Sequence, residues 1–131
     1  METDGPAAPL PLLVVGSVNM DLVMQLERAP LGGETLLGRE FAYIPGGKGA
    51  NQAVAAARMG LAVSFVGCVG ADAHGQSLKQ SLHREWVRVD RLRMVEDSPT
   101  GFAAIMVEAD GQNRDGDRPD HPRPDGPFTA G

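Results

Sequence analysis

The sequence predicts an α/β fold that contains part of a parallel sheet, and three stretches of the chain support this prediction. The continuous apolar run Leu12–Gly16 has the length of a strand and the composition of one buried in a parallel sheet. The alanine-rich run Ala50–Met59, followed by Gly60, indicates a helix closed by glycine. A further apolar run, Ala62–Val69, completes a strand–helix–strand crossover, for which a right-handed connection is expected.

Four other segments are predicted to be strands that form two pairs. Leu22–Leu26 is followed by a turn-forming stretch rich in Pro and Gly and then by a returning strand over Thr35–Tyr43. Arg91–Val95 is expected to pair with Phe102–Ala109 across the intervening turn. Polar and apolar residues alternate in Arg91–Val95, which is typical of a sheet covered on one face.

A second helix is expected over Gly75–Trp86. Leu78, Leu82 and Trp86 recur at a spacing of four residues, so we predict that they form its buried face. The glycine-containing stretch 70–75 before this helix lacks the lysine and the serine or threonine of a phosphate-binding loop. We therefore interpret it as a connection into the helix.

Composition excludes several classes of function. The chain has 131 residues, enough for one domain, and its net charge of −5 includes no block of Lys or Arg, which argues against a nucleic acid or an acidic membrane surface as partner. Cys68 is the only cysteine, so an intrachain disulfide and a cysteine-pair metal site are excluded, and we expect a buried thiol that packs as a small apolar side chain. The apolar run 10–15 is too short to span a bilayer. We expect a cytoplasmic protein, with the nucleus as an additional location.

Two polar loops at strand ends predict one binding site. The stretch Gly16–Asp21 follows the first apolar strand, and Gly46–Gln52 leads into the alanine-rich helix. Glycines at a strand-to-helix junction let the backbone approach a ligand closely, and the free N–H groups of the first helical turn then face that ligand. Asn19 and Asp21 are also common in turns, and Asn51 is also a common helix cap, so these residues alone leave both readings open.

The order and spacing of three motifs resemble the ribokinase-like family of carbohydrate kinases. The motifs are Gly16-Ser17-x-Asn19-x-Asp21, Pro30-x-Gly32-Gly33-Glu34-Thr35 and Gly46-Gly47-Lys48-Gly49-Ala50-Asn51-Gln52-Ala53. The likeness continues through Val66–Gly75 and Thr100–Ala103 to Gly111–Asn113, and so covers about residues 12–114. It implies an incomplete ribokinase-like fold: the N-terminal part of a parallel-sheet domain, plus a small β-sheet lid formed by about 22–43 and 91–109.

The resemblance also implies a sugar site, with D-ribose or a similar small sugar as the partner. It gives a substrate-binding role to Asn19, Met20, Asp21, Gly47, Lys48, Gly49, Ala50, Asn51, Ala103 and Ile105. Gly46 and Gly47 would be the hinge at which the lid moves, because only glycine reaches positive φ at little cost. Without the resemblance, a solvated Lys48 and plain sheet packing of Ala103 and Ile105 remain alternatives.

The family's catalytic machinery is expected to be missing from this sequence. The resemblance implies ATP, Mg²⁺ and a monovalent cation (K⁺) as cofactors, and a catalytic aspartate in a Gly-Ala-Gly-Asp motif. The sequence contains no such motif and no ATP-site segment, so we predict no catalytic residue and no metal ligand in it. Phosphoryl transfer depends on positioning and electrostatic stabilisation, so a chain without these parts should be inactive alone.

The two ends of the chain differ from the middle. Residues 1–11 are acidic and proline-rich and are predicted to be a disordered lead. Residues 115–131 contain four prolines, three glycines, four aspartates and one phenylalanine, too little apolar surface to order the segment. We interpret this stretch as a non-homologous disordered tail, from alternative splicing, a frameshift or a gene-model error, with a natural disordered tail as the alternative.

Three functional hypotheses follow. The first is an enzyme of the family, represented by its sugar-binding and lid half, whose family activity phosphorylates D-ribose to ribose 5-phosphate. The second is a non-enzymatic truncated isoform that binds sugar weakly, or that forms a homodimer or a heterodimer with a full-length kinase through the lid sheet. The third is an unstable fragment, because a parallel sheet without its neighbours exposes long edges.

Overall fold

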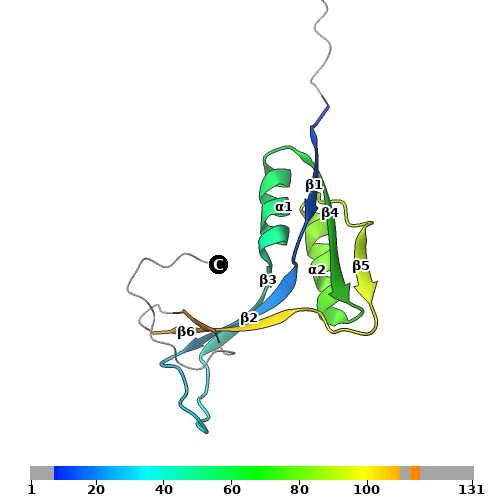
Figure 1. Ribbon diagram of the computed structural model, residues 1–131. Coiled ribbons are helices and arrows are strands. Elements are labelled where there is room, and N and C mark those ends of the chain that lie inside the picture. Colours follow the sequence, from blue (N-terminus) through cyan, green and yellow to red (C-terminus); the bar gives the residue numbers. More distant parts are fainter. Residues whose placement is uncertain (1–7, 110–112, 116–131) are drawn as a thin grey trace, which may run out of the picture.

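The computed structural model describes residues 8–109 and 113–115 (Figure 1). It contains two sheets and two helices, and the order and bounds of these elements are β1 (Pro11–Val15), β2 (Asn19–Leu26), β3 (Glu40–Gly46), α1 (Lys48–Arg58), β4 (Ala62–Gly70), α2 (Ala73–Arg84), β5 (Leu92–Val95), β6 (Phe102–Glu108) and β7 (Asn113–Asp115). Most of the predicted lead and tail lies outside the described residues. Strand β1 nevertheless begins at Pro11, and the backbone of Asp115 belongs to β7.

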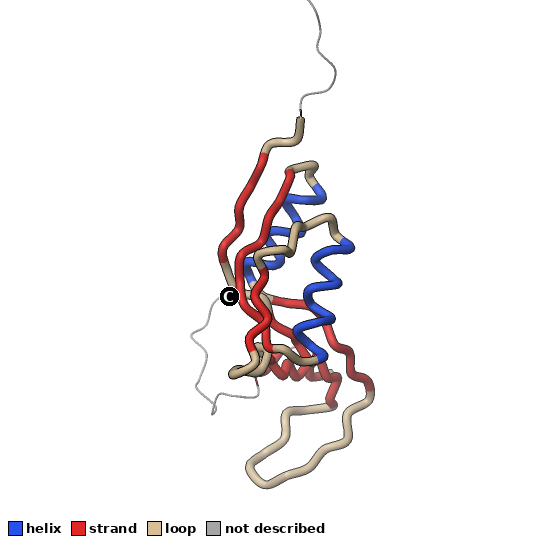
Figure 2. Tube along the Cα trace, turned by 90° about the vertical axis from the view of Figure 1, so that its right-hand side faces the viewer, coloured by secondary structure: helices blue, strands red, loops and turns tan. Residues whose placement is uncertain are grey.

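The larger layer is a parallel sheet with the strand order β1-β4-β5. Both helices lie against one face of this sheet, as Figure 2 shows. Phe65 and Val63 from β4 pack there with Leu78 from α2, and all three side chains are fully buried. The predicted α/β class and the strand–helix–strand crossover are therefore confirmed.

The smaller sheet has the order β3-β2-β6-β7 and lies across one end of the parallel sheet (Figure 1). We call β2, β3, β6 and β7, with the loop between β2 and β3, the lid. Strand β2 pairs with β3 in the antiparallel sense and with β6 in the parallel sense. The returning strand β3 begins at Glu40, not at Thr35 as predicted, because residues 35–38 form a loop without strand pairing.

The predicted pairing between Arg91–Val95 and Phe102–Ala109 is wrong. Strand β5 pairs in parallel with β4, with Leu92 opposite Gly67, and so belongs to the parallel sheet instead of the lid. Leu92 is buried in the core there. Of the segment 91–109, only the part that forms β6 contributes a strand to the lid.

Helix α2 ends earlier than predicted, and Trp86 does not belong to its buried face. The N–H of Trp86 donates to the carbonyl of His83, and the N–H of Val87 donates to that of Leu82, which is the Schellman pattern of helix termination. Trp86 occupies the left-handed position of this pattern with φ 65° and is 88% exposed. Val87, 1% exposed, takes its place in the core.

Helix α1 ends in the same pattern, with the residue that the sequence predicted. Gly60 has φ 95° and donates to the carbonyl of Ala57, while Leu61 donates to that of Ala56. Glycine accommodates this left-handed backbone without strain.

Among the described residues, nothing covers the second face of the parallel sheet, and the prediction of a buried Cys68 is wrong. Side chains alternate along a strand, so Cys68 points away from Phe65 and Val69 and is exposed. Its neighbours on β1, Leu13 and Val15, are also exposed, Val15 to 72%. Within the described ranges, no helix is long and apolar enough to cross a membrane.

Candidate functional site

Three segments meet where the lid joins the parallel sheet. They are the loop Gly16–Val18 after β1, the junction of β3 with α1 at Gly46–Gly47, and Gly101 before β6. The N–H of Ala50 donates to the carbonyl of Ser17 at 3.0 Å, and the N–H of Met20 donates to the carbonyl of Gly101 at 2.9 Å. The two predicted polar stretches therefore meet, and the residue before β6 joins them. The first is shorter as a loop than predicted, because Asn19 and Asp21 belong to β2.

Asp21 is the acidic group of this site. Its carboxylate accepts a hydrogen bond of 2.5 Å from the side-chain amide of Asn19. Partial burial raises the pKa of Asp21 above its usual value, and the bond from Asn19 acts in the opposite direction. A partly desolvated carboxylate that accepts one hydrogen bond still has lone pairs that can accept others. Such a carboxylate can therefore bind hydroxyl groups.

Gly46 and Gly47 allow the close packing around this carboxylate. A Cβ atom on Gly46 would overlap with the Asp21 carboxylate, 2.8 Å from its Cγ atom. Gly47 has φ 102°, and a Cβ atom there would lie 2.6 Å from the carbonyl oxygen of Ser17. Side chains larger than hydrogen are therefore excluded at both positions unless the backbone or Asp21 moves.

Ala103 and Ile105 lie on the same face of the lid as Asp21. In the parallel pairing of β2 with β6, Ala103 is opposite Asp21 and Ile105 is opposite Val23, and both side chains are half-buried. Met20 lies on the other face. Its side chain is 3% exposed and packs in the core, away from Asp21.

The remaining predicted residues lie at the start of α1. Gly49 and Ala50 are buried, whereas Lys48 and Asn51 are exposed. The helix is capped by Gly47 without a side-chain hydrogen bond, so Asn51 is not its cap. Asn51 instead lines a groove of about 390 Å³ between α1 and α2 together with Pro45, a residue on the lid face opposite to Asp21.

Sequence reasoning missed a polar junction between Thr100 and Asp72. The N–H of Gly70 donates to Thr100 Oγ1 at 2.9 Å, and Thr100 Oγ1 donates to Asp72 Oδ1 at 2.6 Å. Asp72 also accepts from the N–H groups of Thr100 and Gly75, each at 2.8 Å. Both Thr100 and Asp72 lie within motifs that the sequence singled out, but the spacing of 28 residues gave no sign that they touch.

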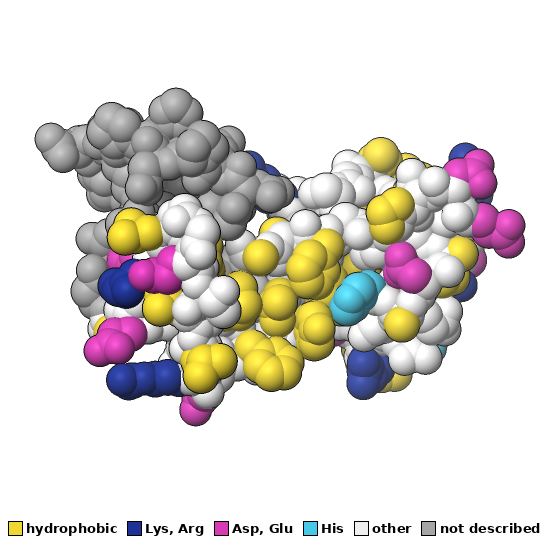
Figure 3. Space-filling model, turned by 90° about the horizontal axis from the view of Figure 1, so that it is seen from below, with side chains coloured by type: hydrophobic (Ala, Val, Ile, Leu, Met, Phe, Trp, Pro, Cys, Tyr) yellow, Lys and Arg dark blue, Asp and Glu magenta, His cyan; other side chains and the backbone are white. Residues whose placement is uncertain are grey.

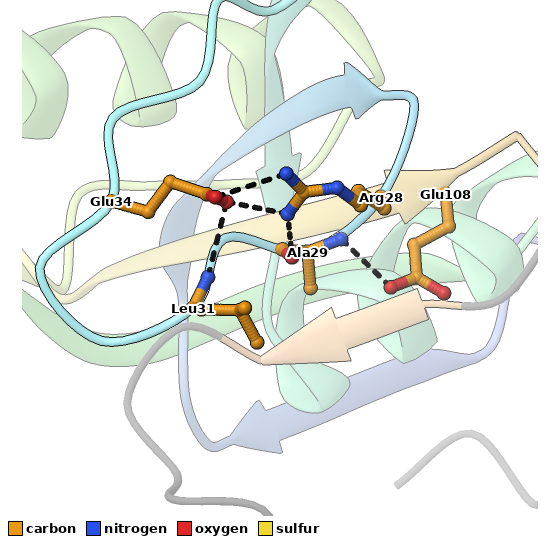
Figure 4. Close-up of polar contacts among 5 residues, drawn as sticks. All are labelled: Arg28, Ala29, Leu31, Glu34 and Glu108. Carbon is orange, nitrogen blue, oxygen red and sulfur yellow. Dashed lines mark hydrogen bonds and ion pairs between the residues drawn. The ribbon is translucent and has the colours of Figure 1, made fainter.

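The motif between β2 and β3 has a local structural role, shown in Figure 4. Arg28 and Glu34 form an ion pair with two hydrogen bonds, and Glu34 also accepts from the N–H of Leu31. The N–H of Ala29 donates to Glu108 on β6 at 2.9 Å. These contacts close the loop and attach it to the lid sheet. Because Arg28 is exposed and Glu34 is partly exposed, we expect their ion pair to contribute little to stability.

Among residues 8–109 and 113–115, no group of three or more His, Cys, Asp or Glu side chains is arranged to hold a metal ion. We therefore assign no residue of this chain to Mg²⁺ or K⁺.

Comparisons with known proteins identify the family of this chain. The model of the pfkB family of carbohydrate kinases matches residues 11–117. Ribokinase of Schizosaccharomyces pombe is 46% identical over 109 residues, which cover 79% of this chain and 34% of that protein. Ribokinase of Bacillus subtilis is 46% identical over 102 residues, which cover 78% of this chain and 34% of that protein.

A solved structure extends the likeness to the fold. The structure of Arabidopsis thaliana ribokinase complexed with ribose and ATP superposes with a TM-score of 0.75 and 40% identity, covering 83% of this chain and 35% of that one. The chain spans about a third of the length of the curated ribokinases reported above. On the family match and the shared fold, this chain belongs to the pfkB family of carbohydrate kinases.

Proposed function

We propose that this chain is the sugar-recognition and lid part of a ribokinase and that it binds D-ribose on the Asp21 face of the lid. The observation that carries the proposal is the partly buried Asp21 carboxylate, held by Asn19 and lying against the backbone of Gly46. The comparisons support ribose as the ligand, since the matched curated relatives are ribokinases and one matched structure contains ribose.

Each residue of the site has a role that follows from its position. Asp21 accepts hydrogen bonds from sugar hydroxyls, and the Asn19 amide both donates and accepts. Ala103 and Ile105 give the lid an apolar surface beside these polar groups. Gly46 and Gly47 form the connection at which the lid closes, and Lys48 lies at the exposed start of α1 beside this connection. Asn51 lines the groove on the other side of the lid, so we give it no contact with the sugar in this arrangement.

The family reaction is ATP-dependent phosphorylation of D-ribose to ribose 5-phosphate, and we propose it for a protein that combines these residues with the rest of the family's domain. ATP is the phosphate donor in that reaction, with Mg²⁺ and K⁺ as ions. The residues described here bind and orient the sugar. They include neither the Gly-Ala-Gly-Asp motif nor a metal-binding cluster, so we propose that this chain alone binds without catalysing.

Calorimetric titration of the purified chain with D-ribose tests the proposal. We expect saturable binding that Asp21→Ala abolishes, and weaker binding of D-arabinose, which differs from ribose only in the orientation of the hydroxyl at C2. Circular dichroism of the same samples verifies that chain and variant are folded. A folded chain that binds neither sugar would overturn the proposal.

A second candidate function is pairing through the lid, and the lid's apolar side chains favour it. Phe41, Tyr43 and Phe102 lie on the lid face opposite to Asp21 and remain partly exposed, Phe41 to 70%. Figure 3 shows apolar side chains gathered across this side of the molecule. An exposed apolar patch of this kind is typical of an interaction site. The partner would be a second copy or a longer kinase, and Phe41→Glu should then shift the sedimentation coefficient from dimer to monomer.

A further inference from the structure

The first turn of α2 contacts the lid through two different kinds of interaction. The first is the junction already described, in which Asp72 and the hydroxyl of Thr100 connect the end of β4, the start of α2 and the residue that precedes Gly101. Thr100 is 6% exposed and is the only polar residue in the buried class within the described ranges. A buried hydroxyl whose partners are all satisfied fixes its neighbours in one arrangement.

The second interaction is a ring contact from His74, two residues after Asp72. The His74 ring lies 5.4 Å from the Phe102 ring and 5.2 Å from the Tyr43 ring, measured between centroids. Phe102 and Tyr43 belong to β6 and β3, which lie on either side of β2. The first turn of α2 therefore contacts both strands that flank the strand carrying Asp21.

Backbone pairing with β2 connects β6 to the proposed sugar site. Gly101, directly after Thr100, accepts the N–H of Met20, and the parallel ladder continues from Met20–Phe102 to Asp21–Ala103. A change in the position of Thr100 would therefore move Ala103 relative to Asp21. Where β3 enters α1, the connection is made of two glycines, and the contact with the loop after β1 is a backbone hydrogen bond from Ala50 to Ser17.

We propose that Asp72 and Thr100 are positioning residues that fix the start of the lid strand β6 on α2, so that lid movement pivots at Gly101 as well as at Gly46–Gly47. The effect of this attachment on sugar binding rests on the proposed function, whereas its effect on lid opening does not. The hydrogen bonds of Thr100 attach the lid at the α2 side.

Hydrogen–deuterium exchange of the full 131-residue chain tests the attachment. Thr100→Val removes the hydroxyl while keeping the shape of the side chain. We expect exchange of the β2 and β6 amides to become at least about tenfold faster, the effect of losing roughly 1.4 kcal/mol of local stability. The amides of α1 and those of β4 before Gly70 should be unchanged, whereas the Gly70 N–H itself loses its partner. Thr100→Ser, which keeps the hydroxyl, should restore the original rates.

Asp72→Asn is a second variant that retains the helix cap, because asparagine also caps helices. It should accelerate lid exchange, whereas Asp97→Asn, at an exposed carboxylate in the loop before Thr100, should not. Equal acceleration of lid and core in Thr100→Val, or no acceleration, would overturn the proposal.

Ribose titration of the same variants separates the two proposals. If the unaltered chain binds ribose, Thr100→Val should weaken binding by about tenfold and Thr100→Ser by much less. Unchanged affinity in Thr100→Val would overturn the positioning role. If the unaltered chain is folded and binds no ribose, the proposed function fails, and the exchange experiment still decides whether the junction holds the lid.

Discussion

The carboxylate of Asp21 lies directly against the backbone of Gly46, where a Cβ atom would come within 2.8 Å of the Asp21 Cγ atom. The two residues belong to neighbouring antiparallel strands, β2 and β3, with Asn19 opposite Gly46. The absence of a Cβ atom at Gly46 therefore allows the Asp21 carboxylate to occupy its position in the proposed sugar site.

Gly46→Ala should weaken ribose binding by about tenfold or more and change the stability of the chain much less. The added methyl group displaces the Asp21 side chain, which can rotate away, whereas Gly46 itself has no left-handed backbone that alanine would strain. Calorimetric titration gives the affinity and thermal unfolding gives the stability. Gly32→Ala, where nothing lies within 4 Å, is the matched control and should leave the affinity unchanged.

Asp21→Ala should weaken ribose binding much more than Lys48→Ala. Charge-assisted hydrogen bonds from two hydroxyls to a partly desolvated carboxylate contribute roughly 1.5–3 kcal/mol each, so a loss of about two decades in affinity is expected. Lys48 is exposed and retains contact with water, so its removal should cost less. The measurement is a ribose titration of both variants in a full-length context. A larger loss for Lys48→Ala would place the main sugar anchor at the start of α1 instead of on β2.

The purified chain should show no ATP-dependent phosphorylation of ribose, because its sequence lacks the Gly-Ala-Gly-Asp motif and its described residues form no metal-binding cluster. An assay coupled to ADP release measures this. Ribose-dependent turnover that disappears in Asp21→Ala would show that the chain carries a catalytic base that we have not recognised.

Asp72 should give the chain part of its stability toward acid. Hydrogen bonds from the Thr100 hydroxyl, the Thr100 N–H and the Gly75 N–H lower the pKa of Asp72 to about 2. A lowered pKa in the folded state contributes stability that is complete above about pH 4, near the unfolded value, and is lost as pH falls toward 2.

The urea midpoint of the unaltered chain should therefore fall more steeply between pH 4 and pH 2 than that of Asp72→Asn, which has no such group to protonate. Asp97→Asn is the control and should follow the unaltered chain. Parallel curves for the chain and Asp72→Asn would mean that the hydrogen bonds of Asp72 are not maintained in solution.

The elements that the sequence predicted well are those whose signals are local. The apolar runs of β1 and β4 and the alanine-rich α1 with Gly60 each contain their own boundary signals. The strand that pairs with β5 could not be predicted in this way, because the alternation of polar and apolar residues in Leu92–Val95 fits either sheet. Only the burial of Leu92 against the helices decides between them, and that depends on tertiary packing.

The candidate site shows the same division. The glycines and polar residues of the two loops were predicted from their place at strand ends, and the structure places these loops in contact. The core packing of Met20 and the position of Asn51 in the groove beside α2 depend on which way each side chain points, which spacing alone does not show. The Thr100–Asp72 junction joins residues 28 apart in sequence and required the fold to be seen.

Trp86→Gly should stabilise the chain, although it replaces a large aromatic residue. Trp86 occupies the left-handed C′ position of the Schellman motif that ends α2, where its φ of 65° strains a bulky side chain. A non-glycine residue there costs roughly 1–2 kcal/mol, and glycine loses about 0.5–1 kcal/mol of this gain through greater freedom of the unfolded chain. Because Trp86 is 88% exposed, little packing is lost.

We therefore expect Trp86→Gly to raise the free energy of unfolding by about 0.5–1 kcal/mol, measured by urea denaturation followed by circular dichroism. Trp86→Ala is the matched control, since alanine removes the same ring but keeps the Cβ atom and therefore the strain. It should leave the stability unchanged or lower it. Equal stabilisation by both substitutions would show that the effect comes from removing the exposed indole and not from relieving the left-handed backbone.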